Sequence, residues 1–284
     1  MNIQKRSEVL FTAFRLKCFA CIFGLFFLVQ GGCVTTGPGG KQSLILLPET
    51  TEISIGQGMA EELKKSEKRL DDEVWQKYLT EVGSRIVAVC DRQNIEYTFT
   101  VIESDQANAF AAPGGFVYFY TGLLREMKSE SEMAAVMAHE ISHVVARHGA
   151  KRLQTAIGAS ILSELVLGNG SSELINAAVG VGMSFAMAGY SREAEREADT
   201  FGIEYMKRAG YNPNGAVSMF ETLARLGGSR QGVFENMLSS HPETQERIQN
   251  AKNQIAGMSL TGKETVGEDR YLQMVRRLPK TAGK

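Results

Sequence analysis

Two histidines four positions apart constrain this chain more than any other feature. They belong to the run His139-Glu140-Ile141-Ser142-His143. In an α-helix, side chains four residues apart lie on the same face, about one turn from each other. The residues around the run are mostly apolar, so we expect it to lie on a buried helix. Any fold of this chain therefore has to place a helix bearing two imidazoles in its interior.

The spacing suits two ligands of a tetrahedral zinc ion. Glu140 follows the first histidine and can reach a zinc-bound water. There we expect it to act as general base, then as general acid toward the leaving amine of a peptide. Chance produces this pattern on the order of once in a few hundred chains of this length. The alternative of a solvated helix is disfavoured by the apolar residues Val136, Met137, Ile141, Val144 and Val145.

A catalytic zinc site needs three protein ligands and an open position. Some proteases take the third ligand from a histidine six residues after the second one. Here that position is Gly149, which excludes this arrangement, and His148 is one residue short and lies round the helix. A second helix offers Glu195, with Asp199 four residues later on the same face. We expect Glu195 to bind zinc and Asp199 to accept a hydrogen bond from a ligand histidine.

The competing interpretation of this second helix is an ordinary solvated face. Glu193, Glu195 and Glu197 alternate with Arg192 and Arg196, a pattern typical of surface ion pairs. Alone, this pattern favours the solvated face, but together with the histidine run it favours a metal ligand at Glu195. Glu197 points about 200° away from Glu195, so we expect it to be a surface residue.

The remaining patterns predict an α+β fold that is mainly helical, with a small sheet beside the histidine helix. The apolar spacing and capping signals predict helices, and the β-branched and aromatic runs predict strands. The expected helices cover 75–89, 129–148, 191–210, 214–227 and 243–256, and the expected strands cover 97–102 and 116–120. Residues 158–189 are rich in glycine. We expect either loops and short helices that form a mobile lid, or a packed helical hairpin, with equal weight.

The first 32 residues are typical of a signal peptide. Basic residues precede an apolar run of 12 residues, Cys18 to Val29, which is shorter than the ~20 residues of a membrane-spanning helix. Cys33 follows Gly32 and is expected to be lipidated, although Gln30 departs from the usual aliphatic residue. Plain signal cleavage or an uncleaved anchor are the alternatives. Residues 33–55 are expected to form the lipidated terminus and a flexible tether, and 256–284 a C-terminal tail.

Composition excludes some classes of protein. Hydrophobic residues make up 43% and charged residues 22%, which is ordinary for a globular protein. The net charge of −1 gives no sign of a nucleic-acid binder. After loss of the signal and lipidation of Cys33, only Cys90 remains, so no disulfide is expected within the mature chain.

Several motifs in one order resemble a known family. The chain is similar to the HtpX, CAAX-prenyl-protease and bacterial envelope zinc proteases of peptidase family M48, the gluzincins. The resemblance covers roughly residues 56–255, the expected protease domain. It implies Glu195 as third ligand, Asp199 behind a ligand histidine, and an edge strand near Asn108 and Ala109 that pairs with substrate. The motifs are Asn108-Ala109-Phe110-Ala111-Ala112-Pro113-Gly114-Gly115, the histidine run, Tyr190-Ser191-Arg192, Glu195 to Asp199 and Ser240-His241-Pro242.

His241 lies in a predicted loop before the last long helix, and three roles remain open. A lone loop histidine is often a surface or packing residue. The resemblance implies a histidine near the metal, where His241 would stabilise the oxyanion of the attacked carbonyl. Alternatively, His241 would occupy the open position of zinc and keep the enzyme latent, a role that we favour slightly.

We therefore expect a zinc endopeptidase with one Zn²⁺ per chain. The resemblance implies unfolded or misassembled envelope proteins as substrates. A chaperone-like assembly factor that uses the same groove, and a degenerate structural zinc protein, are the alternatives. The expected location is the periplasm of a Gram-negative bacterium, with a lipid anchor in the membrane. Val34 after Cys33 favours the outer membrane. No nucleic-acid partner is expected, and the sequence carries no signal for an oligomeric state.

Overall fold

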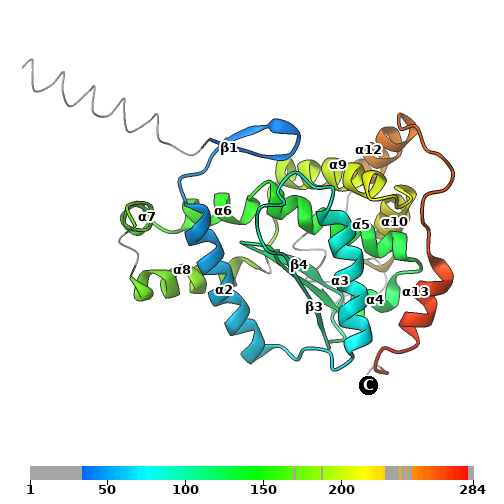
Figure 1. Ribbon diagram of the computed structural model, residues 1–284, viewed down its shortest axis with the longest axis horizontal. Coiled ribbons are helices and arrows are strands. Elements are labelled where there is room, and N and C mark those ends of the chain that lie inside the picture. The colour runs from blue at the N-terminus through cyan, green and yellow to red at the C-terminus, as the bar shows by residue number, and fades with distance from the viewer. Residues whose placement is uncertain are drawn as a thin grey trace, which may run out of the picture.

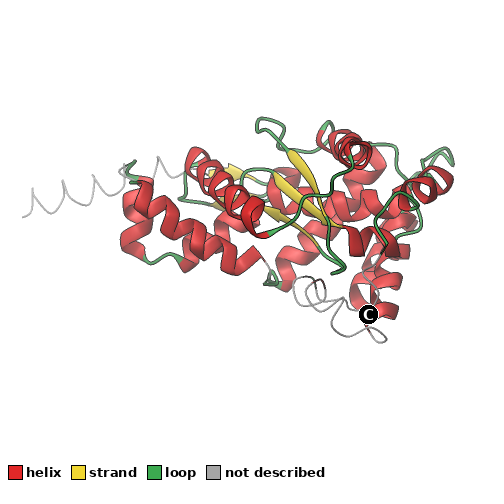
Figure 2. Ribbon diagram, turned by 90° about the horizontal axis from the view of Figure 1, so that it is seen from below, coloured by secondary structure: helices red, strands yellow, loops and turns green. Residues whose placement is uncertain are grey.

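A computed structural model describes residues 34–168, 171–186, 188–227, 237, 241 and 245–280. Residues 1–33, including the expected signal peptide and Cys33, lie outside this part. The fold is α+β and mainly helical, with a small sheet in its interior (Figures 1 and 2). The strands are β1 (Val34–Thr36), β2 (Gln42–Leu44), β3 (Thr98–Ile102), β4 (Ala109–Ala112) and β5 (Phe116–Tyr120). The α-helices are α2 (Glu49–Ser66), α3 (Glu73–Val87), α4 (Thr121–Glu126), α5 (Glu130–Val145), α6 (His148–Ala156), α7 (Ala159–Val166), α8 (Ser172–Ala186), α9 (Arg192–Arg208), α10 (Asn214–Gly227), α12 (Gln245–Ala256) and α13 (Glu268–Val275).

The three-stranded sheet separates two hydrophobic cores. Its strand order is β3-β5-β4, with β3 parallel and β4 antiparallel to the central β5. Side chains alternate between the faces of a strand. Val117 and Phe119 therefore belong to the core under α3, α5, α9 and α10, while Tyr118 and Tyr120 belong to the core under α2, α6 and α8. This alternation places α5, the helix with the histidine run, directly against one face of the sheet.

A close approach between α5 and α9 brings the two predicted metal-binding helices together. Gly202 of α9 permits it, because a Cβ at this position would lie 3.1 Å from the backbone nitrogen of His139. Ser191 caps the start of α9 by accepting a hydrogen bond from the backbone of Ala194, as its sequence position predicts. The expected helix from 191 to 210 is thus present with bounds only slightly different.

The histidine helix ends earlier than expected. The sequence predicts one helix through His148, but α5 ends at Val145 and α6 begins at His148. Between them Arg147 has a left-handed backbone conformation, with φ 53°. Its guanidinium donates to Glu52 over 2.6 Å and to the carbonyl of Leu47 over 2.8 Å. These buried contacts stabilise the turn. The spacing of apolar residues cannot predict them, because they join Arg147 to residues far away in the sequence.

The segment expected to be a flexible tether is folded from residue 34 onward. β1 and β2 form an antiparallel hairpin, and the side chains of Ile45 and Leu47 are fully buried. They contribute to the core under α2, which itself begins at Glu49. The expectation of a flexible tether is wrong for this segment. It was based on the glycine and threonine residues near the start of the segment and gave too little weight to the apolar residues that follow.

The glycine-rich segment 158–189 contains a helical hairpin, α7 and α8, which is one of its two expected forms. The hairpin packs on α2 by close glycine contacts. A Cβ on Gly58 would lie 2.5 Å from the side chain of Val179, and a Cβ on Gly182 would lie 2.7 Å from the sulfur of Met59. The glycines therefore serve packing between α2 and α8, on the left side of Figure 1.

The expected C-terminal tail is joined to the fold through α13. Tyr271 is fully buried and donates a hydrogen bond to the carbonyl of Leu124 over 2.6 Å. Among the described residues, none of the helices combines the length and the apolar character needed to cross a bilayer.

Candidate active site

The histidine run lies in the interior, as its apolar neighbours predict. Ser129 caps α5 by accepting a hydrogen bond from the backbone of Glu132. His139, Glu140 and His143 are buried, with at most 7% of their surface exposed. The Nε2 atoms of the two histidines lie 3.0 Å apart, so both imidazoles face one point.

Glu195 of α9 reaches the same point. Its carboxylate oxygens lie 3.4 Å from Nε2 of His139 and 3.4 Å from Nε2 of His143. His241 completes the group, because its Nδ1 lies 3.1 Å from both Glu195 oxygens and 3.1 Å from Nε2 of His139. The ligand atoms of these four buried residues all lie within 4.8 Å of one another.

Asp199 stands behind the first histidine. Its Oδ1 lies 2.9 Å from Nδ1 of His139, and Arg247 holds the carboxylate through two hydrogen bonds of 2.7 Å each. In a neutral His139 whose proton is on Nδ1, the side of Asp199, the lone pair of Nε2 faces Glu195 and His143. This is the tautomer that a metal-binding histidine needs.

The charges at this point favour a cation. Burial alone would raise the pKa of Glu195, but the three histidines outweigh it and hold the pKa far below its usual range. Burial alone would lower the pKa of His139, but Asp199 and Glu195 raise it to about 10. Burial lowers the pKa of His143 to about 3, which keeps that imidazole neutral. Converging imidazole nitrogens and a carboxylate fit a tetrahedral divalent metal, so the residues present match such an ion.

Glu140 lies beside the group without belonging to it. Its carboxylate is 1% exposed, and Oε1 makes no hydrogen bond within the described part of the chain. Nε2 of His241 lies 3.4 Å from Oε1. Burial raises the pKa of Glu140. Glu140 is therefore a buried carboxylate of raised basicity beside the position where the four ligand atoms converge. Such a carboxylate can accept a proton from a water held at that position.

A family model for peptidase family M48 matches residues 73–255, which include every residue of this site. The chain belongs to peptidase family M48. It is 30% identical over 238 residues to the beta-barrel assembly-enhancing protease of Escherichia coli, covering 80% of this chain and 48% of that protein. It is 30% identical over 218 residues to the Yersinia pestis protein of the same name, covering 73% and 44%. It is also 32% identical over 183 residues to the mitochondrial metalloendopeptidase OMA1 of Arabidopsis thaliana, covering 64% and 36%.

The chain thus spans about half the length, or less, of these relatives. Its relatives are by name proteases, and the Arabidopsis thaliana relative is by name a metalloendopeptidase. Within the described part of the chain, His139, His143, Glu195 and His241 form the group that could hold a metal ion. The identity of the metal and the role of each residue are proposals that follow below.

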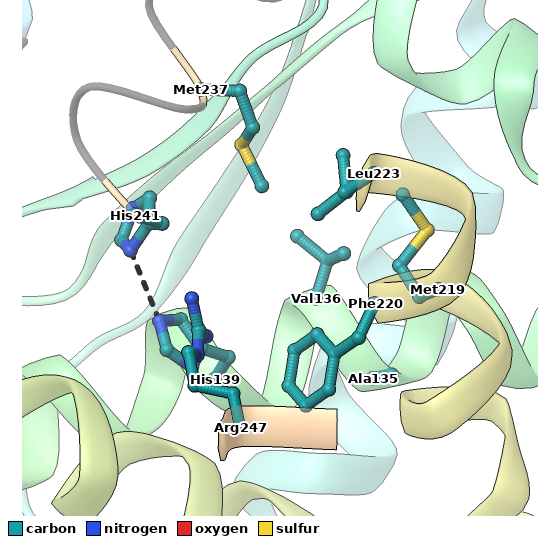
Figure 3. A pocket seen from close by; sticks show the side chains of 9 residues that line it. All are labelled: Ala135, Val136, His139, Met219, Phe220, Leu223, Met237, His241 and Arg247. Carbon is teal, nitrogen blue, oxygen red and sulfur yellow. Dashed lines mark hydrogen bonds between the residues drawn. The ribbon is translucent and has the colours of Figure 1, made fainter. Parts of the chain in front are cut away.

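An apolar pocket lies beside the position where the ligand atoms converge (Figure 3). His139 and His241 form one wall, and the side chain of Arg247 lies over the ring of Phe220 at 4.7 Å. The rest of the lining comes from α5, from α10 and from Met237. These residues include Val136, Met219, Leu223 and Met237.

The predicted substrate strand is an edge strand. β4 lies at one end of the sheet order, next to α5. Asn108 precedes it and Ala109 begins it, and both side chains are buried. Pairing of β4 with a substrate backbone stays a prediction.

Sequence patterns missed three residues around His143. Nδ1 of His148 lies 2.8 Å from Nδ1 of His143, and the ring of Tyr190 stacks on His143 with centroids 4.1 Å apart. Glu197 was expected at the surface, but its side chain is only 8% exposed and faces His148. That expectation is wrong because the hairpin between β1 and β2 covers this side of α9 through Lys41. The motif Tyr190-Ser191-Arg192 was the one signal that pointed to this region.

Proposed function

We propose that this chain is a zinc-dependent endopeptidase in which His139, His143 and Glu195 bind one Zn²⁺ and Glu140 is the catalytic base. The observation that carries the proposal is the convergence of three buried ligand atoms on one point, with the carboxylate of Glu140 beside it. Two histidines and a glutamate with an open position are the ligand set of known zinc peptidases.

The residues divide the reaction between them. When bound, zinc polarises the scissile carbonyl and lowers the pKa of a water. Glu140 accepts the proton of this water and then delivers it to the leaving amine. Asp199, held by Arg247, keeps His139 in the tautomer that presents Nε2. β4 offers backbone groups with which an extended substrate pairs.

The proposed substrates are unfolded or misassembled proteins of the bacterial envelope. Two relatives carry the name beta-barrel assembly-enhancing protease, which supports a role in envelope protein quality control. The apolar pocket beside His139 agrees with this class, because unfolded chains expose apolar side chains. We place the protein in the periplasm, anchored by a lipid on Cys33, with the outer membrane favoured.

Metal content and cleavage measured together test the proposal. The wild-type protein should hold one zinc per chain and cleave casein, and a chelator should remove both properties until zinc is restored. Glu195→Ala should lose zinc affinity and cleavage. Glu193→Ala is the matched control, because Glu193 is on the same helix with 81% of its side chain exposed. Stoichiometric zinc in Glu195→Ala would show that the third ligand is misassigned.

A further inference from the structure

We propose that His148 and Glu197 are positioning residues that hold His143 in its metal-binding orientation. The inference rests on the proposed metal site, and it adds to that site a second chain of contacts behind the second histidine. His139 has Asp199 behind it. In the same way, His143 has Glu197 behind it, with His148 between them.

The direction of the first contact follows from the role of His143. Its Nε2 faces His139 at 3.0 Å and Glu195 at 3.4 Å, so a metal-binding His143 carries its proton on Nδ1. That proton points to Nδ1 of His148, 2.8 Å away. His148 accepts it, and as a neutral imidazole His148 then carries its own proton on Nε2.

The second contact is an electrostatic one between His148 and Glu197. Nε2 of His148 lies 3.7 Å from Oε2 of Glu197, and the same oxygen lies 3.0 Å from Nζ of Lys41. The side chains of His148 and Glu197 are 4% and 8% exposed, so water competes little for these groups. Lys41 offsets the charge of Glu197, as Arg247 offsets that of Asp199.

The backbone is shaped to bring His148 into this place. On a continuous helix, His148 would point about 140° away from His143. The left-handed Arg147 ends α5 instead and turns the chain. Gly149 then passes close to Pro113, where a Cβ would lie 3.1 Å from the proline ring. Tyr190 covers the face of the His143 ring, so contacts fix both the plane and the rotation of this ligand.

Zinc affinity, measured by competition with a chromogenic chelator, tests the inference. His148→Leu removes the acceptor at similar volume and should weaken zinc binding about 10–100-fold. His148→Asn places an amide oxygen near the position of Nδ1, so it should retain affinity within a few-fold. Glu197→Gln should weaken binding less than His148→Leu. Glu193→Gln also removes a Lys41 partner but does not face His148, and should leave affinity unchanged.

The absorption spectrum of the cobalt(II)-substituted protein gives a second readout. It should change in His148→Leu and stay like wild type in His148→Asn and Glu193→Gln, because only the first frees the His143 ring. Wild-type affinity in His148→Leu would overturn the inference, as would equal losses in His148→Leu and His148→Asn, which indicate packing alone. If the wild-type protein itself binds no zinc, the proposed function fails instead.

Discussion

At the scale of single residues, the site places a buried carboxylate among three imidazoles. Glu195 is 4% exposed and lies among three imidazoles, two of which its oxygens approach at 3.4 Å and one at 3.1 Å. A buried carboxylate is costly without a charged or hydrogen-bonding partner. The proposed zinc ion gives Glu195 such a partner and gives the facing nitrogens a common acceptor for their lone pairs.

His241 is placed where it can fill the remaining position around the metal. Its Nδ1 lies within hydrogen-bond distance of His139 and Glu195. We therefore expect His241→Ala to raise basal turnover of a peptide substrate, measured at fixed zinc, because the position for the attacking water is freed.

The oxyanion role of His241 predicts the opposite sign. Loss of an oxyanion donor costs a few kcal/mol of barrier, so turnover would fall by about 10²-fold or more. Zinc content measured in the same samples separates a change in turnover from a loss of metal. An unchanged rate would eliminate both roles and return His241 to a packing residue.

The sequence predicted those site residues that helical spacing brings together. His139 and His143 are four residues apart on α5, and so are Glu195 and Asp199 on α9. The structure brings His139, His143 and Glu195 to one point and places Asp199 against Nδ1 of His139, behind that point. Helical spacing could not place His148, because its position depends on a turn held by tertiary contacts of Arg147.

At the scale of elements, a buried ion cluster fixes the end of the histidine helix. Glu52 of α2 accepts hydrogen bonds from Arg92, in the loop after α3, over 3.0 and 3.2 Å. It also accepts one from Arg147, after α5, over 2.6 Å. Arg92 donates as well to the carbonyl of Val144 in the last turn of α5. Three elements distant in sequence thus meet at one carboxylate.

Removal of this carboxylate should destabilise the protein strongly. Glu52→Ala leaves two buried guanidinium groups without their shared partner, so we expect the free energy of unfolding to fall by about 3–5 kcal/mol. Urea denaturation followed by circular dichroism measures it. Glu61→Ala on the same helix removes an exposed partner of Lys64 and should cost less than about 1 kcal/mol. Equal losses of unfolding free energy in the two variants would show that the ion cluster around Glu52 does not stabilise the fold.

The elements themselves were predictable where their residues repeat with a clear period. The helix around Trp75, the strand 116–120 and the helix after Ser191 are present. The hairpin at 34–44 and the early end of α5 were not predicted. Their stability comes from long-range contacts, such as the burial of Ile45 and Leu47 against α2 and the sheet, which a local pattern does not contain.

At the scale of the whole molecule, the described part of the chain begins at Val34, next to the expected lipidation site. Val34 starts β1, so a lipid on Cys33 would hold the hairpin and α9 close to the membrane surface. We expect mass spectrometry of the purified mature protein to find an acylated Cys33 at the amino terminus, because Cys33 follows a basic start, an apolar run and Gly32. The acyl chains would supply the anchoring, since each buried CH₂ adds ~0.8 kcal/mol. An unmodified terminus at any other residue would refute the anchor.

The proposed activity of the whole molecule requires that the residues that bind the metal differ from the residue that acts as general base. Glu140 is next to the metal-binding group but is not among its ligands. Zinc content and casein cleavage of Glu140→Gln, compared with wild type in the same preparation, test this most directly. We predict stoichiometric zinc with cleavage reduced by at least about 10²-fold, because the general base is lost while the ligands remain. Substantial peptidase activity in zinc-loaded Glu140→Gln would contradict the account.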